Sequence, residues 1–170
     1  MRSLKLALLA TAATAVLSSA TFAADLIVDV PIQDPVIDNS FSFDGAYIGA
    51  FLQGQTTPNT FGIGANLGVN VLMDGLLLGG ELEGTVSMGP EFSGQATGRV
   101  GGLISDSAIV YVYSGVGTRT TTSWYVPLGI GAEVAVADNV GLKGELQYNW
   151  DLTNSAENSV AAKVGLNFHF

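Results

Sequence analysis

Two neighbouring segments and the turn between them decide the fold. Residues 124–150 read WYVPLGIGAEVAVADNVGLKGELQYNW. In residues 124–136, and again in residues 140–150, large apolar side chains alternate with glycine, an amide or a charged side chain. This period of two places successive side chains on opposite faces of a β-strand, and the polar connection at residues 137–139 is typical of a hairpin turn. The stretch therefore predicts two antiparallel strands, each with an apolar face and a small or polar face.

The same alternation continues through the chain beyond residue 45. It predicts eight strands, at residues 46–55, 61–71, 78–88, 95–102, 110–117, 124–136, 140–150 and 160–170. The first strand has no clear phase, because its large apolar residues fall on both faces: Tyr47 and Phe51 on one, Ile48 and Leu52 on the other. Short connections alternate with longer ones, as in outer-membrane barrels with short turns at one end. The short connections are residues 73–75, 105–107 and 137–139.

Alternation alone leaves two architectures open, a soluble barrel with an apolar interior and a membrane barrel with an apolar exterior. The polar face decides between them: it is mostly glycine, whereas a solvated face would carry many Lys and Glu. Its charged residues are Glu81, Glu83, Arg99, Glu133, Lys143, Glu145 and Lys163. In the strands with a clear phase no charge falls on the apolar face, where a midplane Arg or Lys costs about 2–4 kcal/mol. We therefore predict an all-β fold, an eight-stranded antiparallel up-and-down transmembrane β-barrel.

The composition excludes several classes of function. A net charge of −9 repels nucleic acid, so we expect no nucleic-acid partner. The chain has no Cys and one His, which argues against disulfides, thiolate catalysis and the common zinc sites. We expect no catalytic residue, no cofactor and no metal ligand.

The chain divides into three predicted parts. Residues 1–23 have the charged start, the short apolar run and the small-residue cleavage site of a signal peptide, which predicts secretion across an inner membrane. Residues 24–44 carry two prolines and five acids, and we interpret them as a periplasmic leader. Residues 45–170 form the predicted barrel, and we expect it in a bacterial outer membrane.

Four motifs give the chain a resemblance to a known family. They are FDGAYIG at residues 43–49, RVG at 99–101, the hairpin PLGIGAE (127–133) to LKGELQY (142–148), and VGLNFHF at 164–170. With these motifs the chain resembles the small outer-membrane β-barrels of Gram-negative bacteria, the opacity-type proteins with an OmpA-type eight-stranded membrane domain. The resemblance covers the chain beyond about residue 43.

The resemblance implies a role for the last strand and a set of partners. In that family the terminal phenylalanine of an alternating strand is read by the outer-membrane insertion machinery, so Phe168 and Phe170 are the expected insertion signal. The other expected partners are outer-membrane lipids and lipopolysaccharide, and the sequence leaves the oligomeric state open. The outer loops are shorter than those of the family's adhesins, and no peptidoglycan-binding domain follows Phe170. Both departures weaken the case for host-cell adhesion and for cell-wall anchoring.

The inward charges predict ion pairs across neighbouring strands. If Val136 faces Val140 across the turn, Glu133 lies opposite Lys143, where opposite charges attract. Glu145 and Lys163 form the next expected pair. We place Arg99 at the centre of the network, bridging Glu81 and Glu83 beside Tyr113, because its planar head can hold two carboxylates.

Two further residues have expected places. Arg119 falls in an outer loop, and His169, the single histidine, is expected at the interface or in the lumen. A histidine near the C-terminus lies at the periplasmic end, far from the outer leaflet where a lipid-modifying enzyme would need it. The sequence therefore favours a structural outer-membrane barrel with an ion-paired, side-chain-filled lumen that contributes to envelope integrity. A narrow porin-like channel or transporter is the second possibility, followed by a lipid-modifying enzyme or an adhesin.

Overall fold

The computed structural model describes residues 41–57, 59–89, 91–120, 123–152 and 158–170. The predicted signal peptide and residues 24–40 of the predicted leader lie outside this described part. Within it, no helix is long and apolar enough to cross a membrane.

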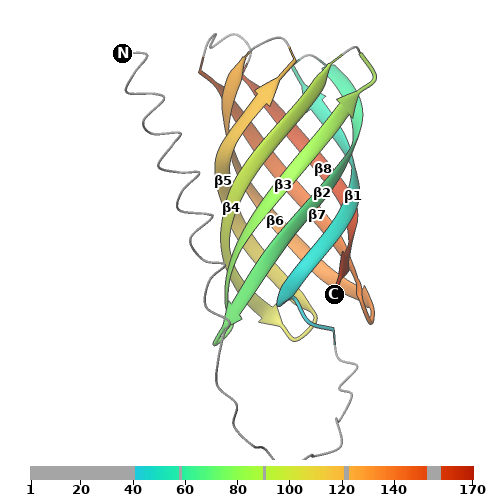
Figure 1. The fold of residues 1–170 in the computed structure, drawn as a ribbon, viewed down its shortest axis with the longest axis vertical. Coiled ribbons are helices and arrows are strands. Elements are labelled where there is room, and N and C mark those ends of the chain that lie inside the picture. Colours follow the sequence, from blue (N-terminus) through green and yellow to red (C-terminus); the bar gives the residue numbers. More distant parts are fainter. Residues whose placement is uncertain (1–40, 58, 90, 121–122, 153–157) are drawn as a thin grey trace, which may run out of the picture. The chain divides into compact units, whose positions relative to one another are not determined.

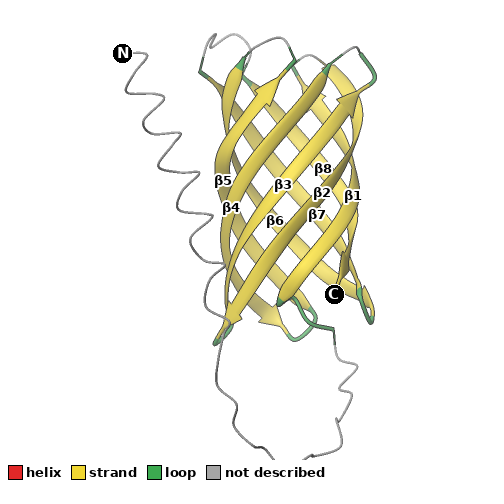
Figure 2. Ribbon diagram, viewed as in Figure 1, coloured by secondary structure: helices red, strands yellow, loops and turns green. Residues whose placement is uncertain are grey.

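Eight strands form one closed antiparallel barrel (Figure 1 and Figure 2). Each strand pairs with the next in sequence, and β1 closes the ring against β8. The strands are β1 (Gly45–Thr56), β2 (Asn59–Met73), β3 (Leu76–Ser87), β4 (Phe92–Ser105), β5 (Ala108–Arg119), β6 (Trp124–Ala137), β7 (Val140–Asp151) and β8 (Ser159–His169). The predicted fold class is confirmed, and β4 extends further at both ends than the sequence pattern indicated.

Apolar side chains cover the outer wall, and polar ones fill the interior. In β2, for example, Ile63, Leu67 and Val71 are exposed while Asn66 and Asn70 are buried. Every Lys, Arg, Asp and Glu within the described strands is buried inside the barrel. This inverted arrangement suits a wall in contact with lipid, where an outward charge is costly.

The aromatic residues of β1 lie on its inner face, which settles the phase that the sequence left open. Tyr47 and Phe51 point inward and are 2% exposed, whereas Ile48 and Leu52 lie on the outer wall. The Tyr47 hydroxyl donates a hydrogen bond to Glu81 Oε2 at 2.7 Å. On the inner face the tyrosine hydroxyl has a hydrogen-bond partner, which it would lack on a lipid-facing wall. Aliphatic side chains need no such partner, so the face with the aromatic residues is the inner one.

The two ends of the barrel differ. At one end, called here the short-turn end, residues 74–75, 106–107 and 138–139 form two-residue turns, and β8 ends there beside the start of β1. Asp74 and Gly75 both have positive φ, 50° and 83°, as a type I′ hairpin turn requires. At the other end, the loop end, the strands are joined by residues 57–58, 88–91, 120–123 and 152–158.

The turn after β6 corrects one expectation. Val140 pairs with Ala137 and not with Val136, because the register shifts between Ala135 and Ala137. The connection is therefore a two-residue turn beside a β-bulge, which inserts one extra residue in one strand. Beyond the bulge, Glu133 pairs with Lys143, as the sequence predicted.

Large aromatic side chains lie near the ends of the strands on the outer wall. Phe61, Trp124 and Trp150 are exposed near the loop end, and Phe168 and Phe170 near the short-turn end. Aromatic rings at both borders of an apolar band are typical of membrane barrels, whose interfaces carry aromatic girdles.

Candidate functional site in the barrel lumen

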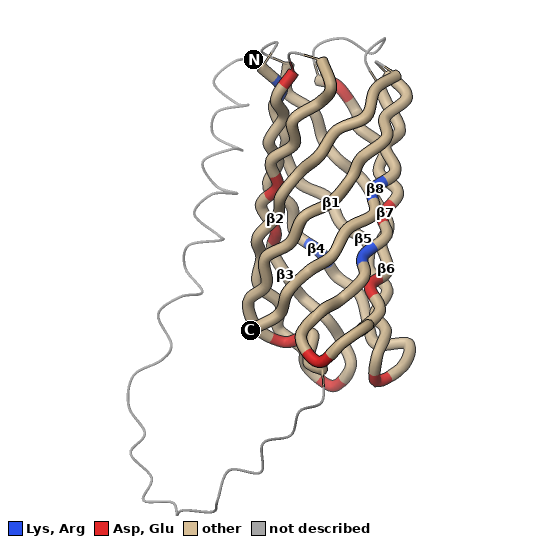
Figure 3. Tube along the Cα trace, turned by 90° about the vertical axis from the view of Figure 1, so that its right-hand side faces the viewer, with Lys and Arg blue, Asp and Glu red and all other residues tan. Residues whose placement is uncertain are grey.

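The centre of the lumen holds a cluster of five charged side chains. Lys143 Nζ lies 3.1 Å from Glu81 Oε2, 3.6 Å from Glu83 Oε1 and 3.5 Å from Glu145 Oε1. Lys163 contacts Glu83 and lies 3.6 Å from Glu145 Oε2. We call these five residues the central cluster. They come from β3, β7 and β8, so the contacts cross the lumen as well as joining neighbours. Figure 3 marks the charged residues along the Cα trace of the barrel.

Aromatic side chains frame the central cluster. The ring centroid of Phe51 lies 5.6 Å from Lys143 Nζ and 5.3 Å from Lys163 Nζ, within the range of cation–π attraction. The Tyr111 hydroxyl donates to Glu145 Oε1 at 2.8 Å. The five side chains of the central cluster are at most 4% exposed.

Arg99 does not occupy the predicted central position. Its Nε and one terminal nitrogen donate to Asn70 Oδ1 at 2.9 and 2.7 Å, and its other terminal nitrogen lies 3.9 Å from Glu81 Oε2. The guanidinium lies over the rings of Tyr47 and Tyr111, and no contact joins it to Glu83.

Register explains where Arg99 lies. It pairs with Gly79, one inward step closer to the short-turn end than Glu81 and two steps from Glu83. Tyr113 is opposite Arg99 in the ladder as predicted, but the guanidinium contacts other rings. Lys143 therefore holds the position that was expected for Arg99.

Glu133 and Lys143 lie opposite each other without forming an ion pair. Glu133 instead accepts hydrogen bonds from Asn167 Nδ2 at 2.9 Å and shares one with His169 Nε2 at 2.7 Å. The long side chain of Lys143 reaches across a lumen only wide enough for side chains, where three carboxylates lie close together. The predicted Glu133–Lys143 ion pair is therefore wrong although its register is right, whereas Glu145 and Lys163 do pair.

His169 lies in the lumen at the short-turn end. Its ring stacks on Tyr47 with centroids 5.4 Å apart, and the rings of Phe41 and Phe43 lie at 4.9 and 5.9 Å. Together with Glu133 these contacts account for the buried histidine as a packing residue. Of the two predicted places, interface and lumen, it occupies the lumen.

Arg119 corrects another expectation. It is the last residue of β5 and not part of a loop, and it points into the lumen with 7% of its surface exposed. Its guanidinium lies 3.6 Å from Asp151 Oδ2 and 3.8 Å from Glu91 Oε1, and it covers the ring of Tyr125. The alternation of β5 contains the missed signal, because Arg119 continues the inward phase of Tyr111 and Tyr113.

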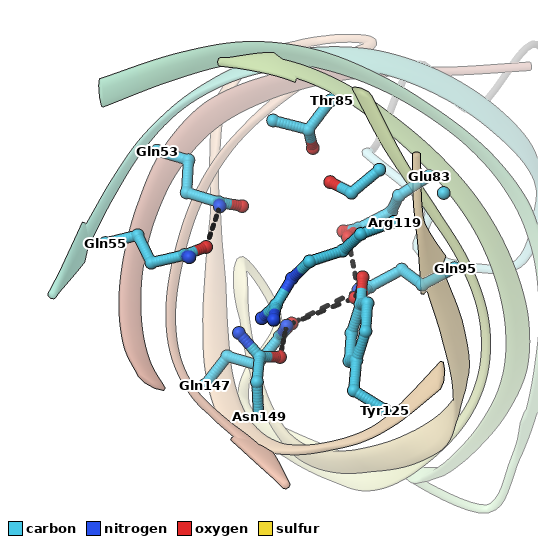
Figure 4. Close-up of a pocket in the computed structure, with 11 residues that line it drawn as sticks. Gln53, Gln55, Glu83, Thr85, Gln95, Arg119, Tyr125, Gln147 and Asn149 are labelled. Atoms are coloured by element: carbon cyan, nitrogen blue, oxygen red, sulfur yellow. Dashed lines mark hydrogen bonds between the residues drawn. The ribbon is translucent and has the colours of Figure 1, made fainter. Parts of the chain in front are cut away.

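Amide side chains fill the lumen between Arg119 and the central cluster (Figure 4). Gln95 and Gln147 donate to each other reciprocally at 3.1 Å, and the Tyr125 hydroxyl donates to Gln95 at 3.2 Å. Gln53 and Asn149 face the same space. The free volume there is about 10 Å³, close to the minimum that holds one water molecule.

The charges of the lumen limit its chemistry. Oxygens of Glu81, Glu83 and Glu145 lie within 4.8 Å of one another, a spacing that could hold a metal ion. The ammonium groups of Lys143 and Lys163 already lie against these oxygens and take the place of a cation. The arrangement therefore pairs three carboxylates with two ammonium groups, and its chemistry is ion pairing.

The expected insertion signal lies on the outer wall. The rings of Phe168 and Phe170 are 5.2 Å apart and exposed. The backbone N–H of Phe170 donates to the carbonyl of Ala46 at 3.0 Å, which extends the seam between the first and last strands. The role of these residues in insertion stays a prediction.

Apart from Tyr113, sequence reasoning assigned no role to the uncharged members of the lumen. Asn66, Asn70 and Asn167 bind the charged side chains, as do the tyrosines of β1 and β5. Each lies on the inward phase of its strand, so phase was the signal that could have identified them. Their hydrogen-bond partners depend on how the strands are staggered in the closed barrel, and the alternation within one strand gives no information on this stagger.

Comparisons with known proteins identify the fold. No protein-family model matches the sequence, and no curated protein sequence matches it either. Solved structures do match. One from the de novo design of transmembrane β-barrels is 17% identical, with a TM-score of 0.59, over 74% of this chain and 95% of its own.

Two natural barrels match to a similar extent. The N-terminal β-barrel domain of Pseudomonas aeruginosa OprF is 16% identical, with a TM-score of 0.58, over 75% of this chain and 98% of its own. The outer membrane enzyme PagL is 11% identical, with a TM-score of 0.54, over 73% of this chain and 99% of its own. At these identities the matches show the fold alone, which is that of an eight-stranded transmembrane β-barrel.

Proposed function

We propose that this chain is a structural barrel of the bacterial outer membrane, of the opacity type, and that it contributes to envelope integrity without catalysis. The observation that carries the proposal is the central cluster, in which Lys143 and Lys163 join opposite sides of the lumen through buried ion pairs. Side chains in this arrangement block the lumen and brace the wall. Outer-membrane lipids, lipopolysaccharide and the insertion machinery are the partners that such a barrel would contact.

Features of the barrel ends favour a structural role over adhesion or lipid modification. The connections at the loop end are two to seven residues long, which offers little surface for adhesion. In the described residues the single histidine lies inside the lumen at the short-turn end, away from any lipid at the loop end. A lipid-modifying site at the outer leaflet that used this histidine as its acid–base group would need it at the opposite end.

A narrow channel is the second candidate, because of the amide-lined space between Arg119 and the central cluster. Its polar walls suit water, and it lies directly above Glu83. The space holds about one water molecule, so conduction would require the central cluster to rearrange. A structural barrel and a channel therefore differ in whether the ion pairs of the central cluster separate to let ions pass.

Single-channel recording in planar bilayers separates these functions. The purified full chain should give no conductance steps in the structural case, and frequent resolved steps would establish the channel instead. A strain that lacks the protein should also become sensitive to detergent, and complementation should restore its resistance. Unchanged detergent resistance in the deletion strain would contradict a role in envelope integrity.

A further inference from the structure

The segment before β1 enters the barrel. Phe43 is 2% exposed and packs with Leu77, Ile109 and Tyr111 in the apolar cluster at the short-turn end of the lumen. Phe41 packs against the same cluster. The sequence pattern assigned these residues to the leader, but their side chains complete the interior of the barrel.

Few interactions hold this segment in place. Asn70 Nδ2 donates to the carbonyl of Phe43 at 2.9 Å, and the N–H of Leu72 donates to Asp44 Oδ1 at 2.8 Å. Gly45 then turns the chain into β1 with a φ of 108°, a conformation that favours glycine. Residues 41–44 belong to no strand, so they can leave the lumen without breaking a ladder of the barrel.

The segment covers buried charged groups. The rings of Phe41 and Phe43 lie against His169, which is hydrogen-bonded to Glu133, a residue with no exposed surface. Arg99 lies in the same part of the lumen, over Tyr111. Withdrawal of the two rings would let water reach these groups from the short-turn end.

We propose that residues 41–44 are a releasable plug that closes the short-turn end of the lumen independently of the central cluster. Anchoring by one buried phenylalanine and two hydrogen bonds keeps the plug in place most of the time, and a local opening of this kind needs no unfolding of the strands. The plug and the central cluster are separate closures. Opening the plug exposes the Glu133–His169 layer and leaves the lumen blocked above it.

Cysteine labelling tests the plug, because the chain has no cysteine of its own. Ile109→Cys places one thiol in the buried apolar cluster, and a water-soluble maleimide reports its access in membrane vesicles opened to both faces. Phe43→Ala should accelerate labelling about 10- to 100-fold, the factor that corresponds to burial of one large apolar side chain. The lipid-facing Leu142→Ala at the same end is the matched control and should leave the rate unchanged.

A second probe locates the effect. Gln95→Cys lies beyond the central cluster towards the loop end, and its labelling rate should not respond to Phe43→Ala. Equal rates for Ile109→Cys with and without Phe43 would overturn the proposal. Equal acceleration at both cysteines would also overturn it, because the barrel would then have loosened throughout.

Exposed variants keep the test decisive if Phe43→Ala does not fold. Asp44→Ala removes one anchor from an exposed position and should raise the Ile109→Cys labelling rate several-fold. Asp106→Ala, an exposed aspartate in a turn at the same end, should not. No difference between these two variants would contradict the plug. Conductance in the wild type would refute the structural function but would not change the labelling rates of Ile109→Cys. Those rates report only whether the plug is in place.

Discussion

The ammonium group of Lys143 lies 3.1 Å from Glu81 Oε2, although their strands, β7 and β3, stand four places apart in the ring of eight. The contact therefore spans the lumen and ties opposite walls together. Because both side chains are at most 4% exposed, neither charge has water as an alternative partner. A buried charge that loses its partner is costly, which makes this contact a sensitive point of the barrel.

Lys143→Met should lower the free energy of unfolding by about 3–5 kcal/mol, less any contribution from water that enters the lumen. Methionine keeps most of the volume and removes the charge, leaving the three glutamates of the central cluster with Lys163 as their one lysine. Urea unfolding in lipid vesicles, followed by tryptophan fluorescence, measures the change. Adding Glu81→Gln to Lys143→Met should recover part of the loss, and a single variant as stable as the wild type would refute the bracing role.

Arg119→Ala should also destabilise the barrel, by about 1–3 kcal/mol, because it removes a charged hydrogen-bonding partner from a buried site. The side chain contacts Asp151 and Ser159 and covers Tyr125. Arg119→Lys keeps the charge but loses the planar contacts, and its stability should fall between those of the wild type and Arg119→Ala. The same unfolding assay checks this order, and an Arg119→Ala midpoint equal to that of the wild type would show that the lumen contacts of Arg119 do not stabilise the barrel.

The fold could be predicted from the sequence because lipid imposes a strict rule on each strand. The alternation gave the outward and inward phases of β2 to β8, and equal counting across the turn gave the Glu133–Lys143 register. The alternation did not give the phase of β1, because Tyr47 and Ile48 are both apolar enough for either face. The position of Arg119 was missed because the predicted strand ended at residue 117.

The ion pairs could not be predicted in the same way. Counting residues along a hairpin finds the neighbour in the ladder, but a long lysine side chain in a narrow lumen also reaches strands on the far wall. Which far residue it meets depends on the stagger at which the ring closes. Lys143 thus pairs with Glu81 instead of its ladder partner, and Asn70 instead of Glu83 binds Arg99.

Two glycines of β4 should respond oppositely to enlargement. Gly101 faces inward, and a Cβ there would meet the Val110 carbonyl and the Tyr111 backbone, which have no room to move. Gly98 faces outward with no atom within 4 Å of a Cβ. Gly101→Val should cost about 1–3 kcal/mol or more by overpacking, whereas Gly98→Val should be neutral or stabilising. Unfolding midpoints that rank the two variants in the reverse order would contradict the assigned faces.

The end of β8 should matter for assembly. Replacing Phe170 with Asp places a charge on the exposed wall beside Phe168, where lipid penalises it, and alters the expected insertion signal. We expect the variant to be degraded before it reaches the membrane, with less heat-modifiable protein on electrophoresis. Phe170→Trp keeps a large aromatic ring and should accumulate normally. Normal levels of the Asp variant would show that the terminal ring is not required.

Truncation of the segment before β1 should separate the leader from the plug. Removing residues 26–40 should leave the protein folded and heat-modifiable, because the prolines and acids of that stretch contribute little that a lipid-facing wall can use. Extending the deletion to residue 44 also removes Phe43 and Asp44, and the apolar cluster loses its lid. The longer deletion should therefore lower the unfolding midpoint and speed labelling of Ile109→Cys, while the shorter one changes neither. If the shorter deletion abolished heat modifiability, residues 26–40 would belong to the barrel itself.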